Sequence, residues 1–198
     1  MSENTEEKRK KITKDFLAGK INRRTFITAV AALSGGFALT AWLPSFFKSS
    51  GREAPLNEAQ AAFIETVQQH LFPKGPDSPG AADINAAAYL QFVLADPNVN
   101  SDDRQLLIDG IGRLETVCQN EFGRTFTALN FLQKEGALRK IEQQNWGERW
   151  LSLLLLYIFE ALLTDPIYGG NPDGAGWEWL EHRQGLPQPN KSNMYGVQ

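Results

Sequence analysis

Apolar side chains recur every three or four positions through most of the chain, the spacing that places them on one face of an α-helix. The first such segment begins at Asn57, a residue type that caps helix N-termini, and ends at Phe72-Pro73. A second segment runs from Asp83, its expected cap, to Asp96-Pro97. The pattern therefore predicts two amphipathic helices joined by the Gly- and Pro-rich loop at 74–80.

Three further helices are expected downstream. Ser101 opens one that runs toward Phe122-Gly123, with acidic residues in its first turn, where the helix dipole favours negative charge. A weaker pattern covers 130–144. Residues 150–163 are apolar almost all round, and because fourteen residues are too few to cross a bilayer, this helix is expected at the centre of the core. No segment shows convincing strand alternation, so the sequence predicts an all-α, single-domain bundle of about five helices over 51–198.

The first 50 residues follow a different pattern. Arg23 and Arg24 precede a run from Thr25 to Phe47 that contains no charged residue. A transmembrane helix, a general secretory signal and a twin-arginine signal would each contain such a run. Its Gly, Ser and Thr residues make it only mildly hydrophobic, which disfavours a permanent anchor. Arg23, Arg24 and Phe26 are similar to the core of the bacterial twin-arginine motif, so we predict an export signal over residues 1–50.

The edges of this signal depart from the motif (S/T)-R-R-x-F-L-K, because Asn22, Ile27 and Thr28 occupy its first, sixth and seventh positions. No clean A-x-A cleavage triplet follows, and Ser49-Ser50-Gly51 is only a tolerable site, so both removal and retention as an anchor stay open. The twin-arginine route carries folded proteins, either with a cofactor already inserted or with a partner. We therefore expect a periplasmic, membrane-associated protein that carries a cofactor or accompanies one that does.

Charge separates the same two regions. Residues 1–50 contain nine Lys and Arg against four Asp and Glu, a net charge of +5, whereas residues 51–198 contain eleven against nineteen, a net charge of −8. An acidic body argues against nucleic acid as its partner. The charge distribution therefore supports two parts with separate tasks, a basic leader and an acidic helical domain.

Few residues are available for catalysis or metal binding. The single cysteine, Cys118, excludes an intrachain disulfide and lies in an apolar-periodic stretch, where we expect a buried thiol. His70 is placed to interact with the terminal carbonyls of its helix, and His182 lies in a polar tail. The sequence contains no dinucleotide-binding fingerprint, P-loop, G-x-S-x-G or H-E-x-x-H motif. No catalytic, cofactor-binding or metal-binding residue is therefore assigned.

One C-terminal segment, Asp165–Trp179, combines glycines that permit unusual turns, prolines that stiffen the chain, and aromatic residues. As a rigid loop it would present Tyr168, Trp177 and Trp179 as anchors to a partner, or fold them onto its own core. Composition does not choose between these two arrangements.

The same loop contains oxygen ligands that would suit calcium, from Asp165, Asn171 and Asp173. Their spacing is not that of an EF-hand, and Pro172-Asp173-Gly174 is foremost a turn sequence. The turn interpretation is therefore favoured over a metal site.

Three features together give the chain a resemblance to the gluconate 2-dehydrogenase subunit 3 family, the small (gamma) subunits of membrane-bound sugar and polyol dehydrogenases. They are the twin-arginine-like leader, Phe72-Pro73 followed by Ser78-Pro79-Gly80-Ala81, and the D-P-x-Y-G-G-N-x-D-G-x-G-W pattern that begins at Asp165. The last is the most specific, and the resemblance covers most of residues 55–190. The tail is less typical of the family, since Glu181-His182-Arg183 follows the final tryptophan.

This resemblance implies a small helical subunit without a redox cofactor of its own. Its partners would be a large FAD-containing subunit of the glucose-methanol-choline type, in some complexes a multi-haem cytochrome c subunit, and the twin-arginine translocase. The small subunit would supply the export signal for the flavoprotein and stabilise it, with FAD and haem c held on the partner subunits. The interface candidates are Tyr168, Asn171, Asp173, Trp177 and Trp179.

An alternative of a different class is an independent periplasmic protein, either a metal-assisted enzyme or a small-ligand binder. Its candidate residues are Asp165, Asn171, Asp173 and His182. Such a protein would gain thermal stability when a metal or sugar is added to the isolated chain.

Overall fold

The structure is a computed structural model that describes residues 55–190, together with residues 11, 192 and 193. The leader predicted over residues 1–50, with Arg23, Arg24 and Phe26, lies outside the described residues. Within them the chain forms α-helices and short 3₁₀ helices, and its sole β feature is an isolated bridge between Gly75 and Ser78. The all-α prediction is therefore confirmed.

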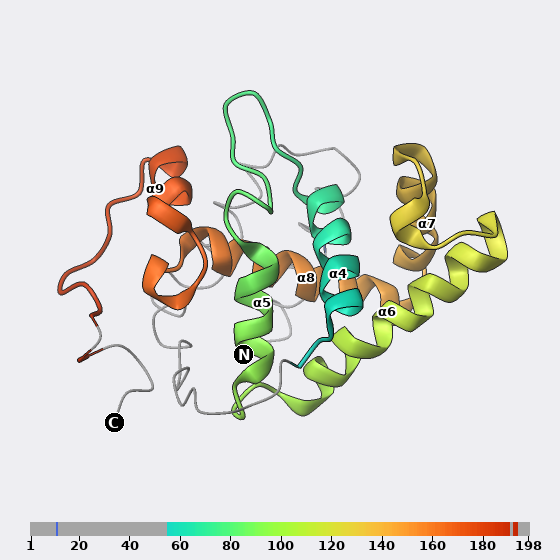
Figure 1. The fold of residues 1–198 in the computed structure, drawn as a ribbon, viewed down its shortest axis with the longest axis horizontal. Helices are drawn as coiled ribbons and strands as arrows, with labels where there is room; N and C mark the ends of the chain where they lie inside the picture. The colour runs from blue at the N-terminus through green and yellow to red at the C-terminus, as the bar shows by residue number, and fades with distance from the viewer. Residues whose placement is uncertain (1–10, 12–54, 191, 194–198) are drawn as a thin grey trace. The chain divides into compact units, whose positions relative to one another are not determined.

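Six α-helices make up this body: α4 (Glu58–Leu71), α5 (Ala86–Ala95), α6 (Ser101–Phe122), α7 (Phe131–Glu142), α8 (Asn145–Leu163) and α9 (Ala175–Leu180). Three 3₁₀ helices join them: η1 (Phe126–Ala128), η2 (Pro166–Tyr168) and η3 (Pro172–Gly174). Helix α8 contacts each of the other α-helices, as expected for the most apolar segment. Figure 1 shows it passing behind α4 and α5, with α6 and α7 at one end and α9 at the other. Among the residues described, no helix has the length and hydropathy that a membrane span requires.

Asparagines begin three of these helices. Asn57 Oδ1 accepts the Gln60 N–H at 2.9 Å while Gln60 Oε1 accepts the Asn57 N–H at 3.1 Å, a reciprocal capping box that starts α4. Asn130 and Gln133 form the same pair at the start of α7. At α6 the cap is Asn100, whose side chain accepts from Asp102 and Asp103, so the predicted Ser101 is the first helical residue.

Asp83 is not the cap of the second helix, which corrects the sequence-based expectation. Asn85 has a left-handed backbone (φ 53°) that interrupts helical geometry, so α5 begins only at Ala86. Asp83 instead organises the preceding loop, since its carboxylate accepts the Gly80 N–H and binds Lys74 Nζ, each at 2.8 Å. The hydrogen bond from Lys74 holds the pKa of Asp83 below its ordinary value.

The core is closely packed where α6 meets α8. Trp150 is fully buried and its indole N–H donates to the Leu107 carbonyl at 3.1 Å. A Cβ added to Gly110 would lie 2.1 Å from Trp150 Nε1, so this glycine makes room for the indole. Cys118 is also fully buried, and burial raises the pKa of its thiol to about 12. The predicted buried cysteine is thus confirmed.

Candidate functional site

The motif segment after α8 folds back over the C-terminal end of that helix. Residues predicted as one loop form η2 and η3 and then continue as α9, so Trp177 and Trp179 project from a short helix. Six residues are too few to show apolar periodicity, which is why the sequence did not reveal α9. Helix α9 contacts α8, and the motif is therefore packed against the core.

Asn171 is the central residue of this arrangement and is completely buried. Its backbone N–H donates to the Ile84 carbonyl at 3.0 Å, and its Nδ2 donates to the Thr164 carbonyl at 3.0 Å. Its Oδ1 accepts the Gly176 N–H at 2.6 Å. The side chain thereby connects the end of α8 to the start of α9, and the backbone of the same residue binds the turn before α5.

Trp177 makes a second connection to the same helix end. Its indole N–H donates to the Leu163 carbonyl at 2.8 Å, which satisfies a carbonyl that has no partner within α8. The motif glycines permit this close packing. A Cβ on Gly176 would lie 2.1 Å from the Leu162 carbonyl oxygen, and one on Gly170 would lie 2.9 Å from the Ala161 carbonyl oxygen. Much of the motif therefore serves to cap and cover α8.

The five predicted interface residues are distributed between the core and the surface. Tyr168 is buried, with its ring 6.4 Å from that of Phe92, and Asn171 is buried as described. Asp173 is exposed, whereas Trp177 and Trp179 are partly buried. The interface stays a prediction, and the side chains that reach the surface to form it are those of Asp173, Trp177 and Trp179.

The calcium arrangement is not assembled. Asn171 Oδ1, which would be a ligand, is occupied by the Gly176 N–H inside the chain. Asp165 uses one carboxylate oxygen to accept the Ile167 N–H at 3.0 Å and thereby begins η2. In the part of the chain that the structure describes, no group of three or more His, Cys, Asp or Glu side chains is placed to hold a metal ion.

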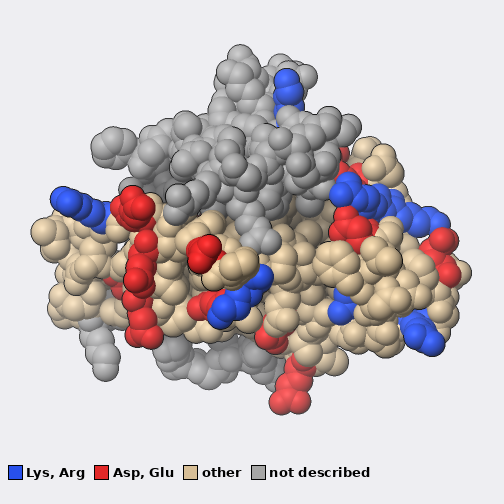
Figure 2. Space-filling view, turned by 90° about the horizontal axis from the view of Figure 1, so that it is seen from above, with Lys and Arg blue, Asp and Glu red and all other residues tan. Residues whose placement is uncertain are grey.

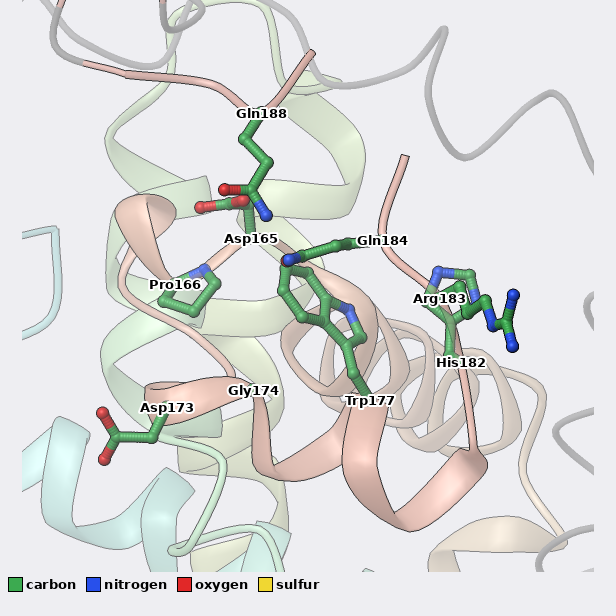
Figure 3. A pocket seen from close by; sticks show the side chains of 9 residues that line it. All are labelled: Asp165, Pro166, Asp173, Gly174, Trp177, His182, Arg183, Gln184 and Gln188. Carbon is green, nitrogen blue, oxygen red and sulfur yellow. The ribbon is translucent and has the colours of Figure 1, made fainter. Parts of the chain in front are cut away.

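A groove of about 630 Å³ opens between this motif and the tail that follows α9. Its lining residues are Asp165, Pro166, Asp173, Gly174, Trp177, His182, Arg183, Gln184 and Gln188. In Figure 3 the Trp177 indole occupies the middle of the group, with Gln184 next to it, and Asp173 directs its carboxylate away. The groove thus gathers Asp165, Asp173 and His182 from the alternative sequence hypothesis, but not Asn171.

The sequence analysis missed part of this groove. Arg183, Gln184 and Gln188 lie in an irregular polar tail, and no motif or periodicity singles them out. Only the path of the tail back past Trp177 brings them to the site. The His182 N–H donates to the Trp177 carbonyl at 2.8 Å and fixes where that path begins.

His70 has a different role from the one expected. Its Nε2 lies 3.0 Å from Glu135 Oε2, and its ring packs 4.7 Å from that of Phe131, so it joins α4 to α7 instead of meeting the terminal carbonyls of α4. Beside it, Phe131 and Leu132 are 65% and 78% exposed at the start of α7. This exposed apolar pair is a second surface feature that the sequence analysis did not single out.

The charged surface is mixed in sign at the α6–α7 end. Figure 2 shows Lys and Arg beside Asp and Glu there, consistent with ion pairs of Lys140 with Glu121 and of Arg139 with Glu135. Exposed pairs of this kind contribute little to stability. They do prevent a strongly charged patch of one sign at this end.

Comparisons with known proteins identify the family. The family model described as gluconate 2-dehydrogenase subunit 3 matches residues 58–185, from the first residue of α4 to the tail that lines the groove. No curated protein and no solved structure matches this chain. The match covers well over half of the 198 residues. The chain therefore belongs to the gluconate 2-dehydrogenase subunit 3 family.

Proposed function

We propose that this protein is the non-catalytic small subunit of a periplasm-facing, FAD-dependent sugar or polyol dehydrogenase, which it helps to export and to stabilise. The observation that carries the proposal is the family match over residues 58–185, because it includes every helix of the described body. Membership in this family fits an accessory subunit of a dehydrogenase complex. The flavin, and haem c where present, would reside on partner subunits.

The leader supports the export role. Arg23, Arg24 and Phe26 precede an uncharged run, as in signals that carry folded proteins across the bacterial inner membrane. A flavoprotein that has already bound FAD would need a route of this kind. If the flavoprotein has no signal, the signal on this chain would serve for both.

The surface of the helical body supports the stabilising role. Phe131 and Leu132 are adjacent and largely exposed, although burying large apolar side chains is favourable. Trp177 and Trp179 also reach the surface at the opposite end of α8. Aromatic and large apolar side chains of this kind are typical anchors of protein–protein interfaces. We propose that the flavoprotein covers at least one of these two regions.

The direct test is a pull-down of the C-terminally tagged full chain from its native membrane fraction, with a visible spectrum and mass spectrometry of the eluate. We expect a large dehydrogenase chain with a flavin spectrum, with or without haem bands. Recovery of a colourless lone chain would contradict the subunit assignment and favour the independent-protein alternative.

The export role is tested by replacing Arg23 and Arg24 with lysine, which keeps the charge of the leader. We expect both this chain and its flavoprotein to accumulate in the cytoplasm. Arg9→Lys is the matched control, because it makes the same change outside the motif and should leave export intact. Arrival of the flavoprotein in the periplasm despite retention of this chain would refute the shared signal.

A further inference from the structure

We propose that the groove between α9 and the tail at 182–188 binds a neutral sugar ring or cyclic polyol. This inference concerns the groove alone and does not depend on export or on the escort role. The groove volume of about 630 Å³ lies within the range of small-ligand sites, roughly 300–1,000 Å³. The chemistry of its lining then indicates which ligand class it fits.

The indole of Trp177 forms an apolar wall with a fixed orientation. Its N–H is held by the Leu163 carbonyl at 2.8 Å, and a Cβ added to Gly174 would lie 3.2 Å from its Cε3, so the glycine backbone packs closely against the ring. The indole is therefore positioned before any ligand arrives, which lowers the entropic cost of binding. A pyranose ring offers a C–H face that packs well on such a surface, because an aromatic ring is an apolar body with a negative face.

The polar side chains beside the indole are of the kind that pairs with hydroxyl groups. Gln184 and Gln188 each carry an amide with both donors and an acceptor, and the Asp165 carboxylate accepts only. Asp165 is held by the bond from the Ile167 N–H at 3.0 Å. In Figure 3, Asp165 and Gln188 lie together at one side of the indole and Gln184 lies across it. Adjacent sugar hydroxyls, each a donor and an acceptor, match this set.

The charges around the groove favour a neutral ligand. The lining contains two carboxylates, from Asp165 and Asp173, with one guanidinium and one imidazole, from Arg183 and His182, and Asp173 directs its carboxylate away from the indole (Figure 3). Neither a multiply charged anion nor a metal ion would find an excess of the opposite charge. Because the tail side chains are exposed, water competes for them, and we expect a Kd on the order of 1 mM.

The test is an NMR titration of the full chain, labelled with ¹⁵N in its tryptophans and held in a detergent that contains no sugar. The probe is D-glucose, and D-glucuronate, which keeps the pyranose ring and adds a carboxylate, is its anionic counterpart. We expect one indole resonance to shift saturably with glucose, and the same resonance to be absent from Trp177→Phe. Glucuronate should bind at least about fivefold more weakly, because its carboxylate would be repelled by the Asp165 carboxylate beside the indole.

A second variant keeps the test independent of folding. Gln184→Ala combined with Gln188→Ala alters two exposed tail positions and should weaken glucose binding at least about fivefold. Gln119→Ala, an exposed glutamine on α6, is the matched control and should bind as the unaltered chain does. A shift that does not saturate, a double variant that binds normally, or glucuronate binding as tightly as glucose would each overturn the proposal.

Discussion

The indole N–H of Trp177 donates a 2.8 Å hydrogen bond to the backbone carbonyl of Leu163, the last residue of α8. A residue that the sequence suggests as an exposed partner anchor is therefore also a cap on the central helix. Asn171 Nδ2 likewise donates to the carbonyl of Thr164, the residue that follows α8. Trp177 and Asn171 together hold the motif segment against the core. The groove and the surface tryptophans depend on these two contacts for their position.

Replacing Asn171 with alanine removes both side-chain hydrogen bonds and leaves the Thr164 carbonyl and the Gly176 N–H buried without partners. We expect a loss of about 2–4 kcal/mol in the free energy of unfolding, measured by urea denaturation. Asp173→Ala is the control, because it places alanine on a similar left-handed backbone (φ 55°) at an exposed position. A loss below about 1 kcal/mol in the unfolding free energy of Asn171→Ala would contradict the stabilising role of these two hydrogen bonds.

Two glycines that lie two residues apart on α6, and so on roughly opposite faces of the helix, should respond in opposite directions to alanine. At Gly110 the new Cβ would lie 2.1 Å from Trp150 Nε1, so we expect a loss of about 3 kcal/mol in stability. At Gly112 the Cβ would meet nothing within 4 Å, and alanine should add about 0.5–1 kcal/mol through helix propensity. Thermal melts of the two variants measure both effects, and equal melting temperatures would refute the predicted packing.

Glu160 makes stability depend on pH. Burial raises its pKa to about 7 from an ordinary value of 4.5, while Tyr89 donates to its carboxylate at 3.4 Å. Between these two values the folded chain binds more protons than the unfolded one, so stability should fall as pH rises from 4.5 to 7. Glu160→Gln should remove this slope and be more stable above pH 7 by about 2–3 kcal/mol. Urea unfolding curves recorded from pH 4.5 to 7 and above measure the free energy of unfolding of both proteins. The same pH dependence in the two would contradict a raised pKa at Glu160.

Cys118 should be inert in the folded chain. It is fully buried, and its thiol has a pKa raised to about 12 by burial. We expect a thiol-reactive dye at pH 8 to label it only as the protein unfolds, at a rate that follows the unfolding rate in urea. Rapid stoichiometric labelling in native buffer would show that the thiol is accessible.

Local signals in the sequence were sufficient for much of the fold. Asn57 caps its helix as predicted, because a cap depends on a few neighbouring backbone groups. Residues 150–163 lie in the central helix because an all-round apolar segment must be surrounded by others. Asp83 was misjudged as a cap, since its partners Lys74 and Gly80 lie in a loop whose path no local pattern specifies.

The sequence by itself therefore determined the all-α class, most helix positions, the buried cysteine and the family, all of which follow from short-range patterns and motifs. Only the tertiary structure decided what the motif side chains do. Tyr168 and Asn171 are buried while Asp173 is exposed, because burial depends on where α8, α5 and the tail meet. The groove at Trp177 depends on the same packing. The tail residues that line it carry no sequence pattern that links them to Trp177, and they become its neighbours only when the chain folds.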